Sequence, residues 1–204
     1  MSTYAPLLEA LAVLALTLPL ALGLHLPTLW FLVPVVVIVA TRRRSEPYGL
    51  TLTNPGSARL HVAMWLIVFL PYLAGHYLWG VWWQGASFEL RWPPQLWRVA
   101  IDQVLIVALP EEMFFRGYLQ TQFDKTFAKP FRLFGANYGW GLPLAAALFA
   151  VCHVFNGGPA RLIVFFPGLW YGWLRTRTDT IAVPALYHAA SNVLMQIMLS
   201  SLTR

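Results

Sequence analysis

Seven long apolar stretches constrain this chain more than any other feature of its sequence. A helix needs roughly 20 residues to cross the hydrocarbon core of a bilayer, and several of the stretches approach or exceed that length. Only 11% of the 204 residues are charged, whereas a soluble domain carries about a quarter. Because so few charges cannot cover a water-facing surface, we predict an all-α, polytopic bundle of membrane helices. The predicted spans are Leu7–Leu24, Leu26–Ala40, His61–Trp83, Leu96–Leu119, Trp140–Phe155, Arg161–Leu174 and Ile181–Leu202.

The number of spans follows from the lengths of these stretches. The second, fifth and sixth are short for a membrane crossing, so we expect seven helices and leave eight as an alternative. Neither an internal repeat nor a low-complexity segment divides the chain. We therefore predict one integral membrane domain over residues 1–204.

Basic residues are concentrated in alternate loops of the predicted bundle. Arginine and lysine are enriched on the cytoplasmic side of membrane proteins, so this asymmetry places these loops and the N-terminus in the cytoplasm. The net charge of +6 then reflects those loops, and the expected partner is membrane lipid rather than nucleic acid. The basic residues of the three loops are Arg42, Arg43, Arg44 and Arg59; Lys125, Lys129 and Arg132; and Arg175 and Arg177.

The fourth span holds three charged residues within six positions, in the segment Pro110-Glu-Glu-Met-Phe-Phe-Arg-Gly117. An ionisable side chain at the centre of a membrane helix costs about 2.5–3.5 kcal/mol on insertion scales, so such groups tend to mark function. Glu112 and Arg116 are four residues apart and can pair on one helix face. Glu111 points about 100° away, without that partner, and is the candidate general base. Pro110 should disturb the helix, as is tolerated where a helix lines a cavity.

Two further spans carry matching polar groups. Phe149 and His153 are four residues apart, and so are His188 and Asn192, so each pair shares one helix face. Small neighbours, among them Ala145–Ala147 and Ala189, would allow close helix approach. We expect the three polar stripes to face one another across a central polar cavity. The residues alone thus predict a buried base, two imidazoles and an amide on converging helices.

In this order, the motifs Glu-Glu-x-x-x-Arg, Phe-x-x-x-His and His-x-x-x-Asn resemble those of the CPBP family. These are intramembrane proteins of the CAAX prenyl protease and bacteriocin-processing type, also called ABI proteins. The resemblance covers roughly Ile101 to Met195 and places the motif-bearing catalytic core at about residues 96–202. It implies a glutamic-type intramembrane endopeptidase that needs neither a metal nor another cofactor.

The resemblance also implies a role for each motif residue. Glu111 would activate the hydrolytic water, and His153 would help to hold that water. Glu112 and Arg116 would form a supporting pair. The remaining two residues, His188 and Asn192, would line the oxyanion site.

The family resemblance further suggests a biological setting. The short, compact build suits a prokaryotic member in the inner membrane. The expected substrate is a membrane-associated protein or peptide that enters laterally from the bilayer, and removal of a C-terminal sorting or anchor segment is the narrower hypothesis.

Several other interpretations compete with the protease. The charged cluster could be a structural ion-pair network, or Glu111, Glu112, His153 and His188 could bind zinc in a membrane metallohydrolase. A proton-coupled transporter or a bacteriocin immunity protein without turnover would also explain buried polar groups. Glu9, alone in the first span, is interpreted as a packing or interfacial residue.

One mismatch remains in the predicted bundle. With the spans drawn as above, Glu111 lies in the cytoplasmic half of its helix, whereas His153 lies past the midplane. A fifth helix that begins several residues earlier, or tilting of the helices, would bring the two side chains to one level.

Overall fold

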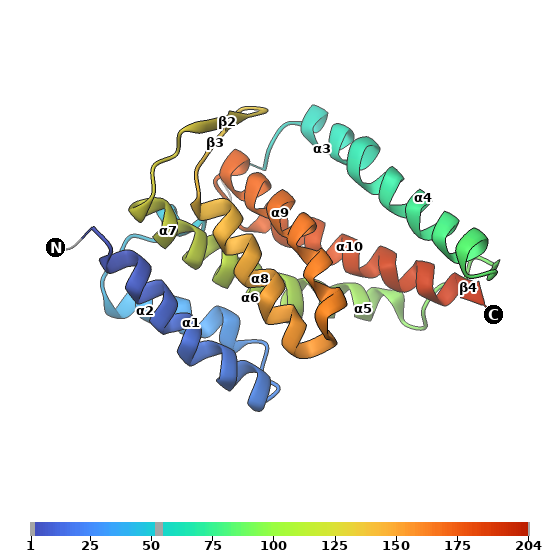
Figure 1. Cartoon of the computed structure of the whole chain (residues 1–204), viewed down its shortest axis with the longest axis horizontal. Helices are drawn as coiled ribbons and strands as arrows, with labels where there is room; N and C mark the ends of the chain where they lie inside the picture. Colours follow the sequence, from blue (N-terminus) through green and yellow to red (C-terminus); the bar gives the residue numbers. More distant parts are fainter. Residues whose placement is uncertain (1–2, 52–54, 204) are drawn as a thin grey trace.

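The computed structural model describes residues 3–51 and 55–203, and this part of the chain is mostly helical, with seven continuous helices (Figure 1). The helical class is therefore confirmed, and each predicted span coincides with one helix apart from shifts at the ends. The seven are α1 (Ala5–Gly23), α2 (Leu29–Ala40), the helix Ala58–Trp83, the helix 96–126, α8 (Gly141–Gly157), α9 (Phe165–Thr178) and α10 (Ala182–Ser201).

Both of the longest helices alternate between α and π geometry. Each carries a proline, Pro71 or Pro110, at the start of an α segment. Proline has no N–H and pushes away the carbonyl four residues earlier, and wider π turns lie on either side of it. The first helix consists of α3 (Ala58–Met64), η2 (Trp65–Phe69), α4 (Leu70–Leu78) and η3 (Trp79–Trp83). The second consists of α5 (Leu96–Asp102), η4 (Gln103–Ala108), α6 (Leu109–Glu112), η5 (Met113–Leu119) and α7 (Gln120–Thr126).

The helix 96–126 lies at the centre of the bundle. It runs through the middle of Figure 1 and contacts α1, α2, α8, α9 and α10. The helix Ala58–Trp83 lies at the edge, where α4 packs against α10. The aromatic side chains of Phe114, Phe115 and Phe149 fill the interior around the central helix. The chain segment with the charged motif is thus held on all sides.

By length and composition, two helices qualify as candidate membrane spans, namely α1 and the helix Ala58–Trp83. Buried core helices of soluble proteins meet the same criterion, but Ala58–Trp83 is the opposite of a core helix, since only 6% of its apolar window is buried. Trp82 and Trp83 are 81% and 82% exposed. A continuous surface of large apolar side chains is unfavourable in water and suits lipid.

The central helix is longer than the sequence predicted. We expected it to end at Leu119, whereas it continues to Thr126, and the fifth helix does not begin earlier than drawn. Glu111 is therefore 15 residues from the end at Thr126, while His153 is 12 residues from the adjoining helix start at Gly141. At about 1.5 Å per residue, the two lie at nearly the same level, which removes the expected mismatch.

Short β segments and single helical turns connect the helices. β2 (Phe131–Leu133) and β3 (Ala136–Tyr138) form a hairpin. Phe134 and Gly135 have positive φ angles of 46° and 82°, as a tight two-residue hairpin turn requires. β1 (Ser87–Phe88) pairs with β4 (Leu202–Thr203). The single turns are η1 (Glu46–Tyr48) and η6 (Pro159–Val164).

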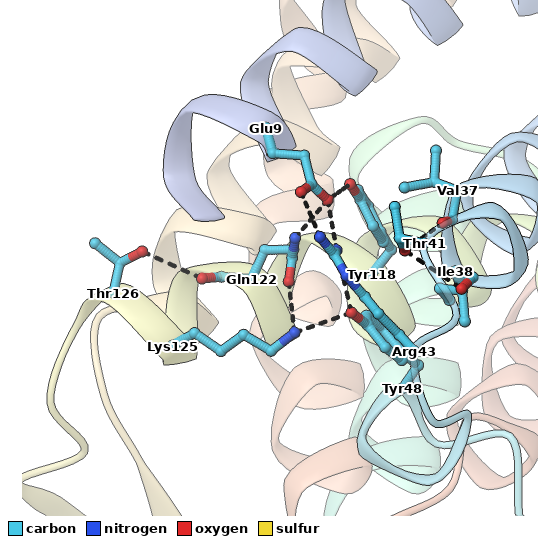
Figure 2. Close-up of polar contacts among 10 residues, drawn as sticks. All are labelled: Glu9, Val37, Ile38, Thr41, Arg43, Tyr48, Tyr118, Gln122, Lys125 and Thr126. Atoms are coloured by element: carbon cyan, nitrogen blue, oxygen red, sulfur yellow. Dashed lines mark hydrogen bonds and ion pairs between the residues drawn. The ribbon is translucent and has the colours of Figure 1, made fainter. Parts of the chain in front are cut away.

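Glu9 ties α1 to the central helix (Figure 2). Its carboxylate accepts hydrogen bonds from both terminal nitrogens of Arg43 at 2.6 Å, from the Tyr118 hydroxyl and from Gln122 Nε2 at 2.7 Å. The bond to Glu9 raises the pKa of the Arg43 guanidinium. Glu9 is thus a fully partnered packing residue, in line with its interpretation from the sequence.

Two helical glycines should respond oppositely to alanine. Alanine is about 1 kcal/mol more favourable than glycine in a helix. At Gly75, an added Cβ meets no atom within 4 Å, so Gly75→Ala should raise the thermal midpoint in detergent. At Gly117, it would lie 2.9 Å from the Tyr48 carbonyl oxygen and 3.1 Å from Met113 Sδ. Gly117→Ala should lower the midpoint, and equal shifts in the two variants would contradict this packing.

Candidate active site

Three of the predicted side chains lie close together, with two imidazoles facing the carboxylate of Glu111. Glu111 comes from α6, His153 from α8 and His188 from α10. Glu111 Oε2 lies 3.8 Å from His188 Nε2 and 4.0 Å from His153 Nε2. These distances are too long for direct hydrogen bonds, and the buried Oε2 atom has no hydrogen-bond partner among the described residues. The predicted convergence of three helices is therefore present.

Glu112 is the most deeply buried charge of the cluster, with no exposed surface. Its Oε1 atom lies 3.0 Å from Arg116 Nη1 and 2.9 Å from His188 Nδ1. The ion pair expected from the four-residue spacing is present, although its geometry at Nη1 does not meet the criteria of a hydrogen bond. His188 thus lies between the two glutamates, with one ring nitrogen facing each.

Arg116 is held by more than its ion pair. Its Nη2 donates a hydrogen bond to the Gly168 carbonyl at 3.2 Å, and its guanidinium carbon lies 4.1 Å from the centre of the Phe149 ring. Stacking of this kind stabilises a cation that has lost its water. A Cβ on Gly168 would lie 3.3 Å from Ala146 Cβ and 3.4 Å from Arg116 Nη2. Glycine at this position lets α9 approach both groups.

Hydrogen bonds donated by Nδ1 determine which ring nitrogen of each histidine carries a proton. Nδ1 of His153 lies 2.9 Å from the Phe149 carbonyl oxygen, and a carbonyl can only accept, so this Nδ1 carries a proton. Nδ1 of His188 faces the Glu112 carboxylate and carries a proton for the same reason. In neutral imidazoles, both Nε2 atoms then present a lone pair toward Glu111. Three hydrogen-bond acceptors therefore converge on one point.

Asn192 is not brought into contact with Glu111. It lies one turn after His188 on α10, and its Nδ2 donates to Gln103 Oε1 at 2.8 Å. Sequence analysis missed Gln103, although a polar residue within an apolar span was the same signal that singled out the motif residues. It also missed Tyr171, which stacks on His188 at 4.9 Å with an angle of 15°. Nothing in the spacing of Tyr171 distinguishes it from other interior aromatic residues.

Two side chains that could serve as nucleophiles, Cys152 and Ser191, directly precede His153 and Asn192 in the sequence. Both have structural roles. Cys152 packs in the apolar cluster around α1, α2 and the central helix. Ser191 donates to the Tyr187 carbonyl at 2.9 Å and accepts from the Tyr171 hydroxyl at 2.9 Å. In the part of the chain that the structure describes, no three histidine, cysteine, aspartate or glutamate side chains are grouped as metal ligands.

The chain matches a protein-family model. The family described as type II CAAX prenyl endopeptidase, Rce1-like, matches residues 92–194. This range contains Glu111, Glu112, Arg116, His153, His188 and Asn192. Neither the curated proteins nor the solved structures include a significant match to the chain.

The buried pair Glu112–Arg116 gives a stability test that is independent of any activity. Removing one partner of a buried pair costs about 3–5 kcal/mol, because the other charge stays buried without compensation. Arg116→Gln should therefore destabilise the protein strongly. The double variant Glu112→Gln/Arg116→Gln should lose much less stability than the sum of the two single variants. Unfolding in detergent measures this, and additive losses would show that the pair is not coupled.

Proposed function

Because the chain belongs to the Rce1-like family of type II CAAX prenyl endopeptidases, we propose that it is an intramembrane endopeptidase in which Glu111 activates the hydrolytic water. The family implies membrane location and CAAX-type protease activity. Our proposal adds the chemical mechanism and the residues that perform it. It places the catalytic core at residues 96–202 within one membrane domain.

The convergence of three acceptors on one point carries the proposal. Glu111 Oε2 lies 4.0 Å from His153 Nε2 and 3.8 Å from His188 Nε2, too far for direct bonds and suitably spaced for a bridging water. A water molecule has two protons to donate, and we assign one to Glu111 Oε2 and the other to His153 Nε2. Glu111 is the only one of the three that is a carboxylate, and it is not engaged by Arg116. It is therefore the group that we assign as general base.

The proposed reaction balances without a cofactor. Glu111 takes a proton from the water while the water oxygen attacks the peptide carbonyl carbon. His153 holds the water through Nε2. When the tetrahedral intermediate collapses, the C–N bond breaks and Glu111 returns the proton to the leaving amine. The products are a carboxylic acid and an amine, which ionise to a carboxylate and an ammonium group.

His188 and Asn192 are the two residues that we assign to the lining of the oxyanion site. Nδ1 of His188 is committed to the Glu112 carboxylate at 2.9 Å, so its ring is held with Nε2 toward the site. Asn192 lies one turn further on α10 and keeps a second N–H besides the one bonded to Gln103. This second N–H is the donor that we assign to the oxyanion.

The same proposal covers the membrane arrangement and the substrate. We propose a prokaryotic inner-membrane protein with seven to eight spans around a central polar cavity, and with the N-terminus in the cytoplasm. The exposed apolar surface of the helix Ala58–Trp83 supports a lipid-embedded position. The substrate would be a membrane-associated protein or peptide entering from the bilayer, and its C-terminal sorting or anchor segment would be removed.

Glu111→Gln tests the general base. The amide keeps the shape of the side chain but cannot accept the proton, so cleavage of a membrane-inserted C-terminal peptide should fall by about 10²–10⁴-fold. Glu89→Gln is the matched control, because Glu89 is 69% exposed and pairs with Arg91 outside the cluster. Cleavage is measured in reconstituted vesicles, and a prenylated CAAX peptide serves as the first substrate.

Two outcomes would contradict the mechanism. Full activity of Glu111→Gln would exclude the carboxylate as base. Loss of wild-type activity on chelation, with recovery on addition of zinc, would favour the metallohydrolase instead.

An inactive Glu111→Gln variant in living cells should also accumulate an unprocessed membrane precursor, which would identify the natural substrate by proteomics.

Gln103 should act as a positioning residue for Asn192. Gln103→Glu retains an acceptor for Asn192 Nδ2, whereas Gln103→Leu removes it. We expect Gln103→Leu to lower kcat by about tenfold with little change in KM, since one oriented donor to the transition state is lost. Gln103→Glu should retain most of kcat. If both variants behave alike, or if KM alone changes, Gln103 does not orient the amide.

A further inference from the structure

A cavity of about 300 Å³ lies between the C-terminal part of the central helix and the end of α9. Arg116, Gln120 and Lys125 of the central helix line it, together with Arg175 and Thr176 of α9. Glu111 and the two imidazoles do not contribute to it. The cavity is thus separate from the reacting atoms, and the proposed mechanism leaves it without a role.

The lining of this cavity carries an excess of positive charge. Four cations line it against two carboxylates. If the charge of Arg116 is counted as balanced by Glu112, three cations still face two carboxylates. Of the two acids, Asp179 is 84% exposed and well solvated, at 3.7 Å from Arg175 Nη1. Asp124 pairs with Lys129 at 2.8 Å, and burial raises the pKa of its carboxyl despite that partner.

Arg175 is the buried cation that the described residues satisfy least. It is 7% exposed, yet its guanidinium makes one hydrogen bond, from Nη2 to the Pro47 carbonyl at 2.8 Å. Its Nε has no hydrogen-bond partner within the described parts of the chain. A guanidinium has five donors, and a buried charge with few partners is costly. An anion in the cavity would remove much of that cost.

Two lysines complete the cation set. Lys129 is 42% exposed and uses one of its three donors on Asp124. Lys125 reaches back to the Tyr48 hydroxyl at 2.9 Å and to Gln122 Oε1 at 2.7 Å (Figure 2), and so keeps a third donor. The cavity therefore combines a fixed buried guanidinium with two flexible ammonium groups, a set well suited to phosphate.

We propose that this cavity is a binding site for a phosphate group, supplied by the headgroup of an anionic lipid or by free phosphate. Three of its four cations, Lys125, Lys129 and Arg175, belong to the basic loops that the sequence places at the cytoplasmic surface. Anionic lipids gather at that surface, and basic pockets between membrane helices bind their headgroups. Arg116 lines the same cavity, so the bound anion lies beside the guanidinium that pairs with Glu112. Binding is thereby linked to the supporting pair of the active site.

Phosphate binding is tested on the full-length protein in detergent. Inorganic phosphate is titrated at constant ionic strength, with chloride as the balancing anion, while tryptophan fluorescence reports thermal unfolding. The wild-type protein should show a saturable rise of the thermal midpoint. Lys129→Gln should weaken phosphate binding by about threefold to tenfold, and Arg175→Gln by about tenfold or more, because each removes a charge-assisted hydrogen bond.

Matched controls separate the site from general charge effects. Arg132→Gln and Arg177→Gln each remove one cation that is close in sequence to Lys129 or Arg175 but does not line the cavity, and both variants should bind phosphate as the wild type does. Lys129 is partly exposed, so its variant remains informative if Arg175→Gln fails to fold. None of these measurements depends on protease activity.

Nanodiscs distinguish the two sources of the phosphate group. If phosphatidylglycerol, but not phosphatidylcholine, competes with inorganic phosphate, the ligand is a lipid headgroup. Equal phosphate binding in both lipids indicates the free anion. The proposal is overturned if inorganic phosphate does not stabilise the wild type saturably and phosphatidylglycerol is retained equally by the wild type and Lys129→Gln. Equal phosphate affinity in the site variants and the controls would also overturn it.

Discussion

The carboxylate of Glu112 is the interaction on which the site depends, because it is shared between Arg116 and His188. A charge with no exposed surface is tolerated only with such partners. By taking both, Glu112 leaves Glu111 unpaired, orients the imidazole of His188 and fixes its Nδ1 proton. Glu112 is paired and Glu111 is not, because adjacent residues of one helix point about 100° apart.

Residues of the surrounding helices stabilise this arrangement. Phe149 covers Arg116 from α8, and Gly168 on α9 presents a carbonyl to it at close range. On the other side, the Glu9–Arg43 pair anchors α1 against the end of the central helix. The apolar side chains of α1, α2, α8 and the central helix form one cluster next to these polar contacts. Loss of any one polar contact should therefore destabilise the packing of the central helix.

Much of this could be predicted from the sequence, and the failures have physical causes. The apolar stretches located all seven helices, and the four-residue spacing placed Glu112 beside Arg116. Hydropathy ended the central helix at Leu119, because Gln120–Thr126 is polar; in the structure, Gln120 and Gln122 are buried and bonded to neighbouring helices. The partnership of Gln103 with Asn192, and of Tyr171 with His188, depends on packing between distant segments, which spacing along one helix does not encode.

The most direct measurement is an experimental structure of the protein in a lipid nanodisc, at a resolution that shows ordered water. We expect Glu111 Oε2 to lie about 4 Å from the Nε2 atoms of both histidines, as it lies 4.0 Å from His153 and 3.8 Å from His188 in the present structure. A water molecule should lie beside these atoms and donate its two protons to Glu111 Oε2 and His153 Nε2. A Glu111 carboxylate facing lipid, or bonded directly to Arg116 in place of Glu112, would contradict the account.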